Sequence, residues 1–231
     1  MRLYAIGDIH GCLPLLQNLL EKIEEDCKGS DATVRKIFLG DYIDRGLYSR
    51  QTIDYLLNWG GKEKYPPIFL LGNHEQVMRK IMRDHDVEKL IDWLHFGGRE
   101  TLQSYGISMH RFAQDLPALV DSLIEKVPQD HVEFLEKLNL SADFGDYFFC
   151  HAGVRPGSAI DDQDEEDLLW IRNQFLDYRG SFGKVVVHGH SISREVEFQS
   201  NRIGIDTGAY ATNRLTALAL EGTKQWLIQT V

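Results

Sequence analysis

The chain has 231 residues, a length that fits one globular domain. Its formal net charge is −10, which argues against sequence-independent binding of nucleic acid, because such binding needs a basic surface. An acidic chain can still take an anionic substrate, since bound cations and a few arginines reverse the charge locally.

Cysteine usage and hydropathy indicate the cellular compartment and whether a membrane partner is expected. The three cysteines, Cys12, Cys27 and Cys150, are odd in number and include no CxxC pair, so a disulfide framework or a zinc ribbon is disfavoured. Reduced thiols and a cytoplasmic location are therefore expected. No apolar stretch approaches the roughly 20 residues of a membrane span, and no signal-like segment precedes Leu3–Ile6, so no membrane partner is expected.

The first half of the chain alternates predicted strands and helices. The strands are Arg2–Ile6, Val34–Leu39 and Ile68–Leu71, and the helices are Leu13–Cys27, Ser49–Trp59 and Glu75–Met82. In the first helix Leu16, Leu19 and Ile23 keep helical spacing, and Pro14 suits a first turn. This alternation predicts an α/β fold with a parallel sheet and helices on its faces.

The second half changes character twice. Residues from about 84 to 140 are predicted to be mostly helical, as an insertion or cap within a single domain of residues 1–231; the helices expected are Val87–Phe96, Arg99–Tyr105, Asp115–Glu125 and Gln129–Leu138. Strands return at Asp146–Cys150 and Lys184–Val187. The tail is predicted as antiparallel strands at Glu195–Ser200, Arg202–Ile205, Leu215–Leu220 and Gln225–Gln229, with a hairpin turn at Glu221-Gly222. The acidic run Asp161–Asp167 is interpreted as a solvated loop or a helix N-terminus.

Three glycine-framed motifs each follow an apolar strand: GDIHG at 7–11, GDYIDRG at 40–46 and GNHE at 72–75. The carboxyl ends of parallel strands share one edge of a sheet, where ligands bind, so the polar residues of these motifs are expected to converge. Two later motifs, HAG at 151–153 and GHS at 189–191, also follow predicted strands and add His151 and His190.

These motifs supply more metal ligands than one ion needs. The six candidate ligands are Asp8, His10, Asp41, Asn73, His151 and His190. Two divalent ions, with one carboxylate bridging them, would use this set; carboxylate, imidazole and amide oxygen without thiolate favour Mn²⁺, iron or Zn²⁺. Two ions about 3.5–4 Å apart make hydroxide available at neutral pH and stabilise in-line displacement at phosphorus.

The five motifs, in this order, resemble those of the PPP family of metallophosphoesterases, which includes serine/threonine protein phosphatases, phage lambda phosphatase and symmetrical diadenosine tetraphosphatases. The resemblance runs from Gly7 to about Leu220. It implies a calcineurin-like metallophosphoesterase fold, an αββα sandwich of central β-sheets flanked by helices with a mostly helical insertion.

The resemblance also implies roles for individual residues. One metal would be held by Asp8, His10 and Asp41, and the second by Asp41, Asn73, His151 and His190, with Asp41 bridging. Manganese is the first expectation for both ions, with iron and zinc as alternatives. His74 would be the general acid, oriented by Asp44, while Arg45 would hold phosphate oxygens. Leu169-Trp170-Ile171-Arg172 matches the second phosphate-binding arginine of bacterial and phage relatives, and water would attack directly.

Several residues keep two interpretations. His188 is expected to be structural rather than a ligand, and Asp206 either supports a ligand or only forms a turn. Arg172 has a surface salt bridge as its alternative, and Cys12 is either an oxidation-sensitive thiol or a small buried side chain. Four histidines of the helical region are expected to face solvent: His85, His95, His110 and His131. Trp93, Leu94 and Phe96 are expected to be core rather than a substrate platform.

The function favoured by the motifs is a metal-dependent phosphatase of the serine/threonine type, acting on a phosphorylated protein, a peptide or a small phosphoester. The alternative is symmetrical hydrolysis of a dinucleoside polyphosphate such as diadenosine tetraphosphate, for which the helical region would have to hold the adenosines although it offers no clear aromatic pair. An inactive phosphate-recognition module is disfavoured because the ligands and the acid are all present. The pattern indicates neither the physiological substrate nor the oligomeric state.

Overall fold

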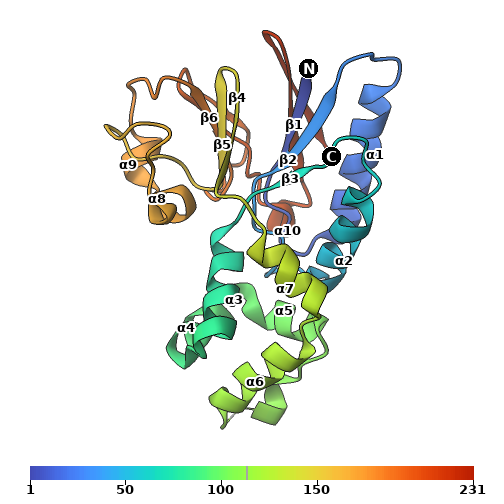
Figure 1. The fold of residues 1–231 in the computed structure, drawn as a ribbon, viewed down its shortest axis with the longest axis vertical. Coiled ribbons are helices and arrows are strands. Elements are labelled where there is room, and N and C mark those ends of the chain that lie inside the picture. Colours follow the sequence, from blue (N-terminus) through green and yellow to red (C-terminus); the bar gives the residue numbers. More distant parts are fainter. Residues whose placement is uncertain (113) are drawn as a thin grey trace.

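A computed structural model describes residues 1–112 and 114–231, and it places two five-stranded sheets face to face with helices on their outer sides (Figure 1). The first sheet has the strand order β10 (Lys224–Gln229), β9 (Thr216–Glu221), β1 (Arg2–Ile6), β2 (Val34–Phe38) and β3 (Ile68–Phe69). The second has the order β4 (Ser141–Phe144), β5 (Tyr147–Cys150), β6 (Val185–His188), β8 (Arg202–Gly204) and β7 (Glu197–Phe198). The predicted αββα sandwich is confirmed.

The N-terminal half forms the parallel part of the first sheet, as its alternation predicts. Strands β1, β2 and β3 pair in parallel, and the intervening helices are α1 (Leu13–Cys27), α2 (Ser49–Gly60) and α3 (Asn73–Asp84). The leucines at the helical spacing of α1, Leu16, Leu19 and Leu20, are all buried. The predicted apolar stripe of this helix is therefore the face that packs on the sheet.

The C-terminal strands form two antiparallel pairs, and the predicted hairpin at Glu221-Gly222 is confirmed, but the two pairs lie in different sheets. Strand β8 pairs in parallel with β6 in the second sheet, whereas β9 and β10 form an antiparallel hairpin on the first sheet, where β9 also pairs with β1. In the second sheet β7 and β8 are antiparallel neighbours, as predicted. Alternating hydrophobicity identifies a strand but does not choose its partner, because pairing is made across the whole fold.

Some short elements were not predicted. Strand β4 pairs with β5 through a tight turn at Gly145, whose φ is +59°, and it contains Ser141 and Asp143, which have low strand propensity. The short helices are α8 (Glu165–Trp170), α9 (Asn173–Leu176) and α10 (Ala209–Thr212). Helix α8 begins inside the acidic run, so the helix N-terminus interpretation holds there; carboxylates in a first turn face the positive end of the helix dipole.

The core lies in three layers that follow the strand alternation. Between the sheets, Leu3 and Ile37 of the first sheet pack with Phe149 and Val187 of the second. Neighbouring residues of the same strands, such as Tyr4, face the opposite way and pack on α1 and α2. Strands buried on both faces explain why β1 reads as an almost continuous apolar run. Helices α8 and α9 cover the far side of the second sheet.

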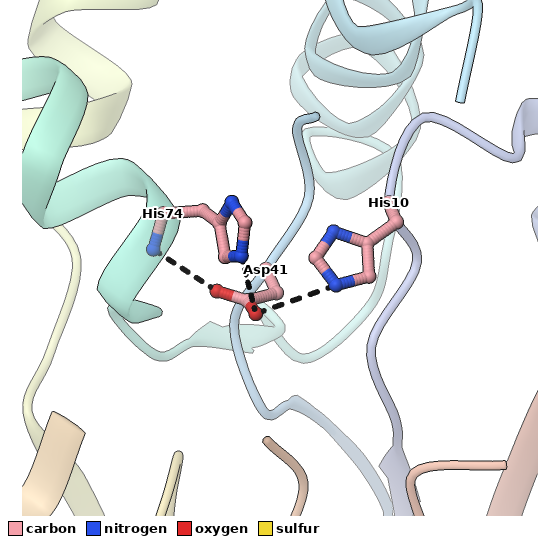
Figure 2. Close-up of side chains that lie close together, drawn as sticks. All are labelled: His10, Asp41 and His74. Atoms are coloured by element: carbon pink, nitrogen blue, oxygen red, sulfur yellow. Dashed lines mark hydrogen bonds and ion pairs between the residues drawn. The ribbon is translucent and has the colours of Figure 1, made fainter. Parts of the chain in front are cut away.

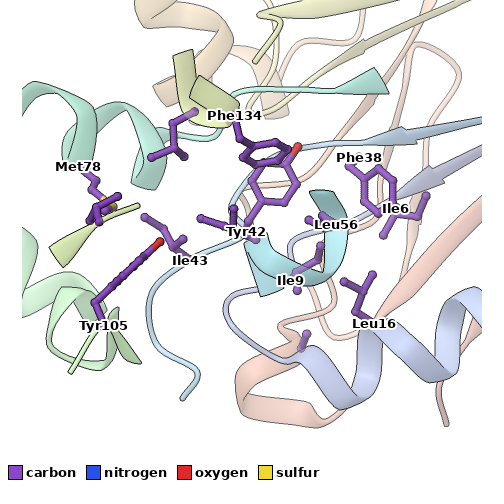
Figure 3. Packing of buried hydrophobic residues seen from close by; sticks show 14 of the residues in the cluster. Ile6, Ile9, Leu16, Phe38, Tyr42, Ile43, Leu56, Met78, Tyr105 and Phe134 are labelled. Carbon is purple, nitrogen blue, oxygen red and sulfur yellow. The ribbon is translucent and has the colours of Figure 1, made fainter. Parts of the chain in front are cut away.

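The helical region continues the layer under the first sheet. Its elements are α4 (Val87–Trp93), the π-helical turn η1 (Leu94–Gly98), α5 (Arg99–Ser104), the 3₁₀ turn η2 (Met109–Phe112), α6 (Leu116–Lys126) and α7 (Gln129–Glu136). Figure 3 shows Tyr105 and Phe134 of this region packed around Tyr42 and Ile43, the residues that follow β2. Gly97, with φ of +112°, kinks the chain between α4 and α5. No helix in residues 1–112 and 114–231 is long and apolar enough to cross a membrane.

One histidine of this region is not solvent-facing, contrary to expectation. His131 is fully buried, with Nδ1 2.8 Å from the Tyr105 hydroxyl and Nε2 2.9 Å from Asp54 Oδ1. These contacts tie α7 to α2 and α5. The polar partners lie far away in the sequence, so local pattern alone gives no sign that they satisfy a buried imidazole.

Replacing Leu218 by alanine tests the packing between the sheets. Leu218 is fully buried on β9, and we expect L218A to lower the free energy of unfolding by about 2–5 kcal/mol, measured by urea denaturation. Leu47, at 61% exposure, is the matched control, for which we expect L47A to change stability by less than about 0.5 kcal/mol. Equal effects of the two changes would contradict the two-sheet core.

Candidate metal centre and active site

The five motif loops meet at one end of the sandwich, beyond the carboxyl ends of β1, β2, β3, β5 and β6. Backbone hydrogen bonds join them: the amides of Ile9 and His10 both donate to the carbonyl of Asp41, at 3.0 and 2.8 Å. The amide of Gly189 donates to the carbonyl of His151 at 2.8 Å, which joins the two later motifs. The structure thus brings together the residues that the strand-end pattern placed at one edge.

Asp41 lies at the centre and belongs to two clusters of side chains that are close enough together to hold a metal ion. The first contains His10, Asp41 and His74 (Figure 2), and the second contains Asp41, His151 and His190. Asp41 Oδ2 is 3.5 Å from His10 Nε2, and Asp41 Oδ1 is 3.4 Å from His151 Nε2. One carboxylate therefore presents its two oxygens to two different sets of imidazoles, which is the arrangement expected of a bridging ligand.

Hydrogen bonds at the far side of two rings set which nitrogen faces the centre. His10 Nδ1 is 2.8 Å from the Ile43 carbonyl, and His151 Nδ1 is 2.9 Å from the Leu39 carbonyl. Because a carbonyl only accepts, Nδ1 carries the proton in each ring and Nε2 keeps its lone pair toward Asp41. Metal-bound histidines are commonly oriented by this kind of partner.

Asn73 and Asp8 complete the candidate ligand set. Asn73 Oδ1 lies 2.8 Å from His151 Nε2 and 3.0 Å from His190 Nδ1, and so belongs with the second cluster. Asp8 Oδ2 accepts from the amide of His190 at 2.9 Å. Asp8 belongs to neither of the two clusters around Asp41, although the resemblance assigns it to the first ion.

The backbone of the site is strained. Non-glycine residues with positive φ cost energy and concentrate at functional sites. Five of the seven such residues in the described parts of the chain belong to the motif loops: His10, Asp41, Asp44, Arg45 and His190. A Cβ on Gly72 would overlap the Asp41 carboxylate, so glycine is required where these loops touch. The surrounding fold holds the side chains in a conformation that the local sequence does not favour.

Charge is concentrated in this buried crevice. Burial raises the pKa of Asp8 well above its usual value, and the nearby charges of Asp206 and Asp41 raise it further. Burial lowers the pKa of His10 to about 3 and, together with His151, that of His190 to about 2, so both rings are neutral at pH 7. Neutral imidazoles keep a lone pair free for a divalent cation, and a bound cation would favour the ionised form of the closely placed carboxyl groups.

The residues present fit a pair of divalent ions. Asp8 Oδ1 and His190 Nε2 are buried atoms that have no hydrogen-bond partner in the part of the chain that the structure describes. Leaving buried polar atoms unpaired costs about 1–3 kcal/mol each, which coordination would recover. With oxygen and imidazole donors and no thiolate, the set suits Mn²⁺, iron or Zn²⁺.

His74 and Asp44 form a buried pair beside Asp41. His74 Nδ1 lies 2.5 Å from Asp44 Oδ2. Burial alone would lower the pKa of His74, but the carboxylates of Asp41 and Asp44 outweigh it and raise the pKa to about 9. His74 is thus protonated at neutral pH, with Nε2 directed toward the crevice, 3.8 Å from Asp41 Oδ2.

Two residues of the helical region hold Asp44, and the sequence interpretation missed both. Trp93 Nε1 donates to Asp44 Oδ2 at 2.7 Å, and Thr101 Oγ1 donates to Asp44 Oδ1 at 2.6 Å. Trp93 was expected to be core, and it is buried, but its indole N–H also reaches the site. Nothing in the local pattern around residue 93 or 101 indicates a partner some 50 residues earlier.

The two candidate phosphate-binding arginines differ in exposure. Arg45 points into the crevice, with its guanidinium 3.1 Å from His10 Nε2 and 3.3 Å from His74 Nε2. It lies 4.7 Å from the ring of Tyr210, a residue on α10 that the sequence interpretation did not select. Arg172 is exposed and makes no ion pair within residues 1–112 and 114–231, so the salt-bridge alternative is not what the structure shows.

Glu75 was not singled out from the sequence, although it completes the GNHE motif. Its carboxylate accepts four backbone N–H groups: from Asp41 at 2.9 Å, Tyr42 at 2.8 Å, Ile43 at 3.2 Å and Gly72 at 3.1 Å. Burial raises the pKa of Glu75, but all four partners are donors, and a proton on either oxygen would oppose one of them. Glu75 therefore acts as a carboxylate that shapes the loop carrying Asp41. The helix-capping position of Glu75, three residues after Gly72, was the available signal.

His188, Asp206 and Cys12 each kept two interpretations from the sequence, and the structure shows the surroundings of all three. His188 is buried away from the clusters, with Nε2 3.4 Å from Arg202, which agrees with a structural role. Asp206 accepts from the amide of Gly208 at 2.9 Å, which is a turn contact, and its nearby charge raises the pKa of Asp8. Burial raises the pKa of the Cys12 thiol to about 11, which disfavours the reactive thiolate.

Comparisons with known proteins identify the family. A family model described as calcineurin-like phosphoesterase matches residues 1–217. The chain belongs to this family. A curated relative from Bacillus thuringiensis (strain Al Hakam), named as the asymmetrical bis(5'-nucleosyl)-tetraphosphatase PrpE, is 28% identical over 241 aligned residues, covering 94% of this chain and 90% of the relative.

Solved structures agree on the calcineurin-like phosphoesterase fold. One, described as a candidate diadenosine tetraphosphatase, superposes with a TM-score of 0.68 at 21% identity, covering 99% of this chain and 93% of its own. A serine/threonine phosphatase from Saccharomyces cerevisiae gives a TM-score of 0.55 at 17% identity, covering 99% and 78%. At these identities the likeness concerns the fold alone, which agrees with the fold that the motif resemblance implies.

Replacing Glu75 by glutamine tests the support of the Asp41 loop. The amide NH₂ of E75Q would face two of the four backbone donors, and each N–H left unpaired costs about 1–3 kcal/mol. We expect a lower free energy of unfolding by at least about 2 kcal/mol and reduced bound metal, measured by urea denaturation and by elemental analysis. D84N, an exposed change on the same helix, should alter neither the stability nor the bound metal. Identical behaviour of E75Q and D84N would refute the Glu75 clamp, meaning the four backbone hydrogen bonds that hold the Asp41 loop.

Replacing Asp41 by asparagine tests the shared ligand. Loss of the central carboxylate charge should lower metal content at both clusters and reduce the rate at least about 100-fold, because even supporting changes around metal ligands cost 10–100-fold. Metal per protein and p-nitrophenyl phosphate turnover are measured on the same preparation, with D143N, a change on β4, as the control. Full metal content and normal turnover in D41N would rule out a bridging role.

Proposed function

We propose that this phosphoesterase hydrolyses dinucleoside polyphosphates, with diadenosine tetraphosphate as the representative substrate. The observation that carries the proposal is the similarity to the asymmetrical bis(5'-nucleosyl)-tetraphosphatase, which extends over 94% of the chain. The complete set of candidate ligands, acid and arginines supports an active enzyme rather than an inactive recognition module. We infer a cytoplasmic location for the reaction, because the three cysteines are free thiols.

This choice reverses the order of the two substrates inferred from the motifs. The sequence favoured a protein phosphatase and kept the dinucleotide as the alternative, and it expected symmetrical cleavage. The motifs describe the metal centre, and the same kind of centre can hydrolyse both phosphomonoesters and phosphoanhydrides. The motifs therefore do not indicate which leaving group the enzyme accepts. Following the name of the relative, we infer asymmetrical cleavage into a nucleoside monophosphate and a nucleoside triphosphate.

Two divalent ions, manganese being the first expectation, would be held by the candidate ligand residues. Asp8, His10 and Asp41 would bind one, and Asp41, Asn73, His151 and His190 the other. When bound, the ions supply hydroxide at neutral pH and neutralise charge on the reacting phosphate.

The chain's own residues position the phosphate and supply the proton. Water adds to phosphorus, and the bond from phosphorus to the leaving oxygen breaks on the opposite side. His74, protonated and held by Asp44, donates its Nε2 proton to that oxygen. Arg45 and the exposed Arg172 would each bind non-bridging oxygens through their planar forks.

Replacing His74 by asparagine tests the acid. A poor leaving group needs protonation more than an activated one, and general acids contribute about 10²–10⁴-fold. We expect H74N to slow phenyl phosphate hydrolysis at least about 100-fold. The loss for p-nitrophenyl phosphate should be smaller than the loss for phenyl phosphate by a factor of at least about ten. Metal content should stay near normal. Equal losses on the two aryl phosphates would argue against proton donation by His74.

A substrate panel tests the proposed function directly. The full-length protein, loaded with Mn²⁺, is given diadenosine tetraphosphate, a phosphoserine peptide and p-nitrophenyl phosphate, and kcat/KM is compared. We expect the dinucleotide to be the best substrate, with AMP and ATP as products by chromatography. Two equivalents of ADP would show symmetrical cleavage, and preference for the phosphopeptide would return the protein phosphatase interpretation to first place.

A further inference from the structure

A pocket next to the metal centre has the chemistry of a nucleotide site. It has a volume of about 340 Å³, within the roughly 300–1,000 Å³ of small-molecule sites. Its walls come from three elements that are distant in sequence: α3, the α4–η1 segment and α8. In Figure 1 these helices lie around the end of the sandwich where the strand-end loops meet.

The pocket adjoins the metal centre on two sides. The ring of Trp170, which lines it, lies 6.3 Å from the ring of His190. On the other side, Phe96 lines the pocket while its carbonyl accepts from Arg45 Nε at 3.4 Å. A molecule bound between these walls would therefore lie next to both a candidate metal ligand and a candidate phosphate-binding arginine.

The two aromatic residues differ in how they are held. Trp170 is fixed, because its Nε1 donates to Gln76 Oε1 at 2.8 Å, and Gln76 in turn donates to Glu165. Phe96 is 56% exposed, although burying a phenyl ring is favourable. An immobilised indole and an uncovered phenyl ring at one pocket offer apolar faces on which a nucleobase stacks.

The charged residues of the pocket suit the rest of a nucleotide. Lys80 and Lys89 supply cationic groups, and Lys80 makes no ion pair in the described residues. Asp92 and Glu166 add carboxylates that accept hydrogen bonds from an exocyclic amino group or a ribose hydroxyl. Cations for phosphate, acceptors for amino and hydroxyl groups, and aromatic faces for the base occur together here.

We propose that this pocket, lined by Phe96, Trp170 and Lys80, binds one nucleoside of the substrate, with adenine against the aromatic walls and the adjoining phosphates directed toward Arg45. The proposal rests on the dinucleotide function proposed above and identifies the part of the chain that selects a nucleotide over a simple phosphoester. Phe96 was expected to be core, which is wrong because its side chain is 56% exposed. Its partner Trp170 lies outside the helical region, on α8, so no aromatic pair was recognised.

The phenyl ring is tested by F96A, with F198A as the matched control, since Phe198 is 47% exposed on β7 of the second sheet. Stacking on an aromatic side chain is worth about 1–3 kcal/mol per base. We expect F96A to raise the KM for diadenosine tetraphosphate at least about fivefold more than the KM for p-nitrophenyl phosphate. F198A should raise neither. Circular dichroism confirms that both variants are folded.

The charge is tested by K80Q against K62Q, an exposed lysine outside the pocket. K80Q should raise the KM for the dinucleotide about two- to fivefold, as for a partly exposed ion pair, whereas K62Q should not. Parallel increases for the dinucleotide and p-nitrophenyl phosphate in both F96A and K80Q would overturn the pocket assignment, because a general structural defect does not distinguish the two substrates.

Adenosine separates this inference from the function on which it rests, because adenosine carries no phosphate. Calorimetric titration of the full-length protein with adenosine should show binding that F96A weakens and F198A retains. If adenosine binds in this way but the dinucleotide is not hydrolysed, the proposed function fails and the pocket stands. If the dinucleotide is hydrolysed while F96A and F198A behave alike in KM and in adenosine binding, the pocket is wrong and the function stands.

Discussion

Several separate parts of the chain hold Asp41 through hydrogen bonds and close imidazole contacts, and the geometry of the site depends on these interactions. Its carbonyl accepts from Ile9 and His10, and its amide donates to Glu75. Its carboxylate lies between the imidazoles of His10, His74 and His151. Since Asp41 also has positive φ, the loop would relax without these partners. The αββα sandwich supplies the rigid strand ends from which the partners come.

The helical region is part of this centre rather than an attachment to it. It packs into the same core as the first sheet, and its Trp93 and Thr101 hold Asp44, which holds His74. The kink at Gly97 places the Phe96 carbonyl against Arg45. The proposed proton donor, the proposed phosphate-binding arginine and one wall of the proposed nucleotide pocket are therefore held by a single segment.

Much of the architecture was predictable because it follows from local patterns. Helix α1 has the bounds that its apolar spacing predicts, and β1, β2 and β3 form the parallel sheet expected of the βαβ alternation. The antiparallel pairing of the later strands was predicted, but their division between two sheets was not, and β4 with the short helices was missed. Strand pairing depends on contacts between residues far apart in sequence, and four-residue elements carry too few residues for a periodicity to show.

The sequence by itself indicated the chemistry: five motifs, each after a strand, predicted the candidate ligand set, the candidate acid His74 and the calcineurin-like phosphoesterase family, and the family is confirmed. This was possible because strand ends converge by a general rule of parallel sheets. Only the tertiary structure decided what surrounds that set: the Glu75 clamp on Asp41, Trp93 on Asp44, buried His131, and the pocket shared by Phe96 and Trp170. Contacts of this kind join residues 34, 49 and 94 positions apart, and folding rather than local spacing brings them together.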